Sequence, residues 1–189
     1  MKFKQVILAS NSPRRKELLA GLDIEFKVKV KSDIDETYPH ELAPEDVPLF
    51  LSKKKAAAYK ADLQEGDLLI TADTVVIIGN EILGKPANEE EARHMLSLLS
   101  GRTHLVTTGV CLTTTTGNRA FSVTTKVTFK ELTPSEINYY VSTYRPFDKA
   151  GAYGIQEWIG YIGVTNLEGS FYNVMGLPVQ RIYEEMNAM

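Results

Sequence analysis

One run of the chain, residues 68–78, is apolar over almost its whole length and carries a single carboxylate. It reads Leu-Leu-Ile-Thr-Ala-Asp-Thr-Val-Val-Ile-Ile and lies between Gly66-Asp67 and Gly79-Asn80. Such a run is typical of a central strand buried on both faces of a sheet, and with the helices expected around it, it predicts an α/β fold. Asp73 interrupts the run. A carboxylate there is costly unless it is paired, hydrogen-bonded or bound to a metal, so we interpret Asp73 as functional.

A second feature, near the N-terminus, predicts an anion site. Residues 6–9 are expected to form a strand and residues 16–21 a short helix, with Ser12 as N-cap and Pro13 in the first turn. A strand that enters a helix through a hydroxyl-rich turn directs N–H groups toward one point, where the helix dipole favours an anion. The serines and arginines of Ser10-Asn11-Ser12-Pro13-Arg14-Arg15 make phosphate the expected guest.

Strands and helices alternate along the rest of the chain. Further strands are expected at residues 25–31, 81–83, 104–115, 119–130 and 161–166, and helices at 43–58, 88–101, 133–143 and after Pro178. Residues 147–156 form a glycine-punctuated loop that would allow a ligand to approach the backbone closely.

Length and composition exclude several classes of protein. The 189 residues suit one domain, 1–189, because no internal repeat or linker is present. The net charge of −3 disfavours binding to a nucleic-acid polymer. No segment approaches the roughly 20 apolar residues of a membrane helix, so no membrane partner is expected. The single cysteine, Cys111, and an N-terminus without signal-peptide features indicate a cytoplasmic protein.

Four motifs follow one another along the chain: residues 8–15, Leu-Ala-Ser-Asn-Ser-Pro-Arg-Arg; Ala72-Asp73-Thr74; Gly84-Lys85-Pro86; and residues 148–156, Asp-Lys-Ala-Gly-Ala-Tyr-Gly-Ile-Gln. Together they resemble the Maf family of nucleoside triphosphate pyrophosphatases, over nearly the whole chain. The resemblance implies an α/β fold with an elongated mixed β-sheet flanked by helices and with two lobes around a cleft, similar to the inosine triphosphate pyrophosphatases.

The resemblance also implies an activity, the hydrolysis of nucleoside triphosphates between the α and β phosphates with Mg²⁺ or Mn²⁺ as cofactor. The products would be a nucleoside monophosphate and pyrophosphate, so the resemblance implies a hydrolase of acid anhydrides. The resemblance also assigns roles by position. Ser10, Ser12 and Arg15 would bind the phosphates, and Glu36 and Asp73 would be the acidic pair that holds the cation. Lys55 and Lys85 would be the phosphate-binding lysines of the catalytic set. We expect Asp73 also to accept a proton from the attacking water.

Within the family, Arg14, Thr74 and Gln156 match the branch that acts on dTTP and UTP. The Gln156 amide offers a donor and an acceptor, which suits the complementary imide edge of thymine or uracil. The chain departs from the family pattern after Gln156, where Glu157-Trp158 stand in place of a glycine at the base pocket.

The sequence leaves two alternative functions open. One is a nucleotide-sensing regulator of cell division that binds triphosphates with little turnover, and the other is an enzyme that removes modified pyrimidine nucleotides. The complete acidic and basic set favours an enzyme over a sensor. Whether the chain forms a homodimer is also left open.

Overall fold

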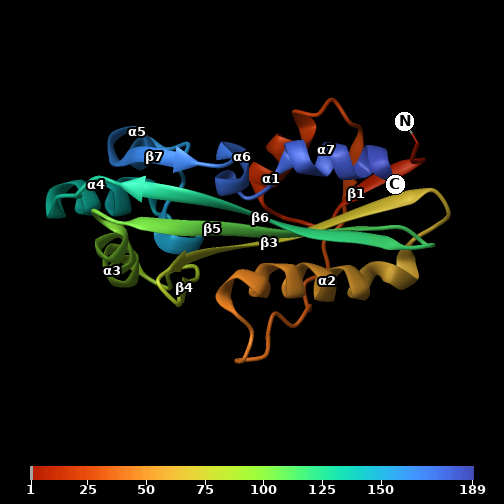
Figure 1. Ribbon diagram of the computed structural model, residues 1–189, viewed down its shortest axis with the longest axis horizontal. Coiled ribbons are helices and arrows are strands. Elements are labelled where there is room, and N and C mark those ends of the chain that lie inside the picture. The colour runs from red at the N-terminus through yellow and green to blue at the C-terminus, as the bar shows by residue number, and fades with distance from the viewer. Residues whose placement is uncertain (1) are drawn as a thin grey trace. The chain divides into compact units, whose positions relative to one another are not determined.

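The structure is a computed structural model that describes residues 2–189. Within them, seven strands form one mixed sheet in the order β2-β1-β3-β5-β6-β7, with β4 beside β3 (Figure 1). The strands are β1 (Gln5–Leu8), β2 (Phe26–Val28), β3 (Asp67–Ile78), β4 (Glu81–Leu83), β5 (Thr103–Thr113), β6 (Asn118–Phe129) and β7 (Val164–Glu168). The helices are α1 (Pro13–Ala20), α2 (Val47–Tyr59), α3 (Glu89–Leu99), α4 (Pro134–Tyr144), α5 (Trp158–Gly163), α6 (Phe171–Met175) and α7 (Val179–Ala188), with short 3₁₀ turns η1 (Pro44–Asp46), η2 (Lys60–Asp62) and η3 (Ala150–Ala152). The predicted α/β fold, a mixed sheet flanked by helices, is confirmed.

Contacts between residues divide the chain into two compact units. The first comprises Met1–Asp73, Thr108–Val123 and Gly176–Met189, and the second comprises Thr74–Thr107 and Thr124–Met175. The long strands β3, β5 and β6 therefore contribute residues to both units. The single domain expected over residues 1–189 stays a prediction, as does the cleft implied by the resemblance.

The first unit is built on parallel strands. β1 pairs in parallel with β2 and with β3, so that Val6 lies opposite both Phe26 and Leu68. Figure 1 shows α2 on one face of these strands and α7 on the other. The core residues shared by α2 and the strands are Ile7, Ala56, Tyr59, Leu69 and Cys111. Cys111 is thus a packed side chain, and burial raises the pKa of its thiol.

The second unit is built on antiparallel pairs. β4 runs antiparallel to the end of β3, with Val76 opposite Leu83, and β7 runs antiparallel to β6, with Val127 opposite Leu167. α3 packs against α4 and against η3. α4 begins with a capping box, in which Thr133 and Glu136 each accept a hydrogen bond from the other's backbone N–H. The capping box fixes the start of the helix that carries the buried Tyr140.

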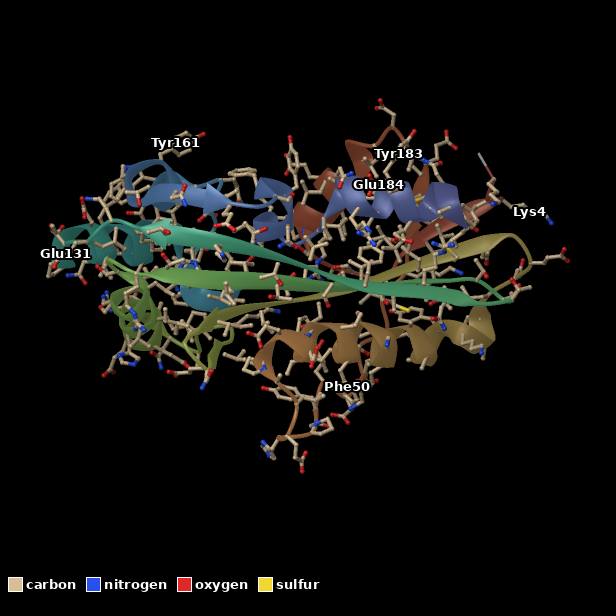
Figure 2. The ribbon with its side chains drawn as sticks, viewed as in Figure 1. Lys4, Phe50, Glu131, Tyr161, Tyr183 and Glu184 are labelled. Atoms are coloured by element: carbon tan, nitrogen blue, oxygen red, sulfur yellow. The ribbon has the colours of Figure 1, made fainter. Side chains whose placement is uncertain are left out.

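The structure corrects the strand expected at residues 161–166. Residues 161–163 belong to α5, because the carbonyl oxygen of Glu157 accepts hydrogen bonds from the N–H groups of Gly160 and Tyr161 and so begins a helical turn. Tyr161 is 84 % exposed and projects from α5 (Figure 2). The strand β7 begins only at Val164.

Two smaller differences concern β2 and α6. The strand expected at residues 25–31 is limited to Phe26–Val28, the residues that pair with β1, because β2 is the edge of the sheet. The short helix α6 has no counterpart among the predicted elements.

Among residues 2–189, no helix combines the length and the apolar character needed to cross a membrane.

Candidate active site

The turn between β1 and α1 has the predicted cap. Ser12 is the N-cap of α1, and its Oγ accepts a hydrogen bond from the Arg15 N–H at 3.4 Å. Ser10 Oγ in turn accepts from the Ser12 N–H at 3.2 Å. Two of the N–H groups expected to face a ligand are therefore used inside the turn. Because each hydroxyl acts here as an acceptor, its own hydrogen remains a donor for an anion.

Arg15 links this turn to two other parts of the first unit. Its Nε donates to the Gly176 carbonyl oxygen at 2.8 Å, and its Nη1 donates to the Ala72 carbonyl oxygen at 2.9 Å. Burial lowers the pKa of Arg15 below its ordinary value, and the charges of Asp73 and Glu36 oppose that effect. The guanidinium is therefore fixed beside β3, one residue before Asp73, while it keeps its positive charge.

Asp73 is paired, as its position inside an apolar strand requires. Every residue of β3 is buried except Asp73 and Thr74. Lys55 Nζ, from α2, lies 2.6 Å from Asp73 Oδ1 and 2.9 Å from Glu36 Oε1. The side chains of Lys55 and Asp73 are 14 % and 15 % exposed, whereas Glu36 is 62 % exposed. The structure thus brings together the two predicted acids around one of the two predicted lysines.

The loop that carries Glu36 is held on α2 by a second ion pair. Lys54 Nζ lies 2.7 Å from Asp35 Oδ2 and donates to the Thr37 carbonyl oxygen at 2.8 Å. The hydrogen bonds from Lys54 and Thr37 lower the pKa of Asp35. Consecutive lysines of one helix therefore bind consecutive acids of one loop, and this fixes the position of Glu36.

Two positioning residues, Thr71 and Gly109, were not identified from the sequence. Thr71 Oγ1 donates to the Ser52 carbonyl oxygen at 2.7 Å and so ties α2 to β3. Gly109 in β5 faces the start of α2, where an added Cβ would lie 2.3 Å from Leu49 N. The register of α2 on the sheet, and with it the position of Lys55, depends on these contacts. The placement of Thr71 two residues before Asp73, on the same face of the strand, is the signal that could have revealed it.

The remaining predicted residues belong to the second unit or to the α1 turn. Thr74 follows Asp73 in β3, and Arg14 is partly exposed in the first turn of α1. Lys85 is exposed, in the segment after β4. Its neighbour Gly84 accepts a hydrogen bond through its carbonyl oxygen from the Gly151 N–H at 3.0 Å, so the backbone beside Lys85 is fixed on the loop of residues 147–156.

Gln156 lies within a tight turn. The Glu157 N–H donates to the Gly154 carbonyl oxygen at 3.0 Å, so residues 154–157 form a β-turn with Gln156 at its third position. Gln156 Oε1 is buried and finds no hydrogen-bond partner among residues 2–189. A substrate N–H that reached this amide would supply the missing donor.

The donor set at Asp73 and Glu36 fits a divalent cation. Carboxylate oxygens are the ligands that Mg²⁺ and Mn²⁺ prefer. Within residues 2–189 no group of three or more histidine, cysteine or acidic side chains is arranged to hold a metal ion. Two carboxylates suit Mg²⁺ when the substrate phosphates and water supply its other ligands. The residues therefore fit a cation that binds together with a triphosphate.

Two of the solved structures that resemble this one have low sequence identity to the chain. One is a nucleoside-triphosphatase / dITP/XTP pyrophosphatase from Mycobacterium abscessus, with 14 % identity, a TM-score of 0.40 and coverage of 75 % of this chain and 95 % of that chain. The other is a HAM1 protein from Coxiella burnetii, with 18 % identity, a TM-score of 0.42 and coverage of 66 % and 72 %.

Sequence relatives are much closer. The chain is 56 % identical over 188 residues to a dTTP/UTP pyrophosphatase from Phocaeicola vulgatus, covering 100 % of this chain and 97 % of that protein. It is 57 % identical to one from Porphyromonas gingivalis, covering 98 % and 94 %, and 46 % identical to one from Flavobacterium johnsoniae, covering 100 % and 97 %. The family profile described as Maf-like protein matches residues 5–189. Because both comparisons extend over nearly the whole sequence, the resemblance is confirmed, and the chain belongs to the Maf-like protein family.

Proposed function

We infer that the chain is a nucleoside triphosphate pyrophosphatase, which cleaves the bond between the α and β phosphates, and that dTTP and UTP are its favoured substrates. Its close relatives carry the name dTTP/UTP pyrophosphatase. The observation that carries the proposal is the ammonium of Lys55, held 2.6 Å from Asp73 and 2.9 Å from Glu36 in the unit that also contains the α1 turn. Hydrolysis of a phosphoanhydride needs this combination of acids and fixed positive charges.

We propose that Ser10, Ser12 and Arg15 bind the phosphates of the substrate. The serine hydroxyls retain their hydrogens as donors, and the N-terminal end of α1 carries partial positive charge. Arg15 adds a full charge whose position is fixed by its bonds to Gly176 and Ala72. Donors that are fixed before the substrate arrives need no rearrangement as charge develops on the leaving pyrophosphate.

Asp73 is proposed to accept the proton of the attacking water. Lys55 bonds to its Oδ1, which fixes the carboxylate and leaves Oδ2 to receive the proton. Asp73 and Glu36 would hold a divalent cation, Mg²⁺ or Mn²⁺, and that cation would neutralise phosphate oxygens and lower the pKa of a water molecule bound to it. Lys55 and the exposed Lys85 would offset negative charge on the triphosphate.

Base selection is assigned to Gln156, with Arg14 and Thr74. The buried end of the Gln156 amide lacks a partner among residues 2–189, and an imide N–H would provide one. The proposed substrates are metabolites of the cytoplasm, so a cytoplasmic location stays our expectation. A sensor with little turnover is not favoured, because the curated relatives carry the names of enzymes.

The test is product analysis with a panel of triphosphates. The purified chain is incubated with dTTP, UTP, CTP, ATP and GTP in the presence of Mg²⁺, Mn²⁺ or a chelator, and modified pyrimidine triphosphates are included. We expect pyrophosphate and a nucleoside monophosphate, fastest from dTTP and UTP and absent with the chelator. Saturable binding without pyrophosphate release would support the sensor instead, and a faster reaction with modified pyrimidines would support their removal as the function.

A further inference from the structure

A group of titratable side chains in the second unit, centred on the buried Tyr140 and Lys149, lies outside the proposed catalytic set. Tyr140 of α4 is fully buried, and its hydroxyl donates to Glu157 Oε2. Lys149 Nζ lies 3.2 Å from Glu157 Oε1 and 2.8 Å from Asp148 Oδ1, with only 9 % of its side chain exposed. A lysine this buried is stable as a cation only beside carboxylates, so Glu157 and Asp148 together compensate its charge.

This group closes the turn that carries Gln156. The Tyr140 hydroxyl accepts a hydrogen bond from the Gly154 N–H at 3.0 Å, while its own hydrogen goes to Glu157. Burial, followed by the hydrogen bond to Glu157, raises the pKa of Tyr140, so the phenol remains a donor. One hydroxyl therefore holds the first and the fourth residues of the Gly154–Glu157 turn, with Gln156 between them.

Packing around the turn leaves it little freedom to shift. A Cβ added at Gly154 would lie 3.1 Å from both Glu157 Cδ and Lys149 Cε. Ile155, the residue before Gln156, is 5 % exposed and packs in the core of the second unit. The backbone on both sides of Gln156 is thus fixed by contacts that do not involve the Gln156 side chain.

We propose that Tyr140, Lys149 and Glu157 are positioning residues that fix the Gly154–Glu157 turn and thereby determine how well the enzyme discriminates between pyrimidine bases. The inference rests on the proposed function, in which the Gln156 amide recognises the imide edge of uracil or thymine. An amide displaced by a loosened turn loses two hydrogen bonds that only an imide substrate makes. A cytosine nucleotide, which presents the opposite pattern of donor and acceptor, loses less.

The experiment compares kcat/KM for UTP and CTP in four variants of the full chain. Tyr140→Phe removes the hydroxyl that holds both ends of the turn, and Glu157→Gln removes, at nearly constant volume, one of the two carboxylate charges that compensate Lys149. Gln156→Ala is the reference for lost base recognition. Tyr144→Phe is the matched control, because Tyr144 stacks on Tyr140 one helical turn away, with ring centroids 5.0 Å apart, and lies outside the group.

We expect the UTP/CTP ratio of kcat/KM to fall about ten-fold in Tyr140→Phe and in Glu157→Gln, and to stay unchanged in Tyr144→Phe. A loss of folded protein lowers both rates equally and cancels in the ratio, so a merely structural role would leave the ratio constant. If Gln156→Ala lowers the ratio but Tyr140→Phe and Glu157→Gln do not, the positioning role is wrong. If Gln156→Ala leaves the ratio unchanged, the assignment of base recognition to Gln156 fails, and the positioning role fails with it.

Discussion

Replacing Gly109 by alanine tests whether the position of α2 on the sheet determines the geometry of the ion pairs that Lys55 makes with Asp73 and Glu36. An alanine Cβ at this position would lie 2.3 Å from Leu49 N and 2.4 Å from Pro48 C. Both are backbone atoms and cannot rotate away. Because ordinary van der Waals contact begins near 3.4 Å, the first turn of α2 must withdraw by about 1 Å.

The withdrawal should reach Lys55, which lies on the same helix, six residues beyond Leu49. Its Nζ is 2.6 Å from Asp73 Oδ1, and hydrogen bonds of this kind weaken beyond about 3.2 Å. A misplacement of about 1 Å in an active site can lower the rate about 10²-fold. Overpacking a well-filled contact also costs about 1–3 kcal/mol of the free energy of unfolding. We therefore expect Gly109→Ala to lose both stability and kcat.

The assay combines urea unfolding with steady-state release of pyrophosphate from UTP. The release of pyrophosphate is measured without urea, at a temperature where the variant and the original chain are both folded. Gly117→Ala is the control, because a Cβ at Gly117 would meet nothing within 4 Å and this glycine has no positive φ. The control should retain the stability and the rate of the original chain. If Gly109→Ala matched the control in both measurements, the dependence of Lys55 on the contact between α2 and β5 would be wrong.

Three further predictions concern single side chains. Asp73→Asn should lower kcat for UTP at least about 10²-fold because it removes the proposed proton acceptor, and circular dichroism should show an unchanged fold. The control Asp62→Asn, which alters a surface ion pair with Lys31, should retain the rate. Thr71→Val removes the hydrogen bond to the Ser52 carbonyl oxygen at nearly constant volume and should lower the free energy of unfolding by about 1 kcal/mol in urea titrations. An unchanged free energy of unfolding would show that this hydrogen bond does not hold α2 on β3. Burial lowers the pKa of His104 from 6.5 to about 4, so the unfolded chain binds the proton more readily than the folded chain does. The free energy of unfolding should therefore fall as the pH falls from 6.5 to 4, by about 3.4 kcal/mol at most. Urea midpoints measured against pH should show this slope in the original chain and lack it in His104→Phe.

Local signals in the sequence determined much of the fold. The N-cap at Ser12, the helix that begins after Thr133 and the apolar strand at residues 68–78 depend on neighbours within a few residues, and each is found where predicted. The prediction of a strand at residues 161–166 was partly wrong, because an apolar stretch of this length suits a helix or a strand equally well. The hydrogen bonds accepted by Glu157 decided in favour of a helix there.

The candidate site shows the same division between local and tertiary causes. The sequence alone identified Asp73 as a residue that needs a partner, because a carboxylate inside an apolar strand is costly under any arrangement of the chain. It could not identify Lys55 Nζ as that partner by physical reasoning, since three consecutive lysines point in different directions and the register of α2 decides which one meets β3. Only the tertiary structure determined that register, through the close approach of Gly109 to Leu49 and the bond from Thr71 to Ser52, because both contacts join segments that are far apart in the sequence.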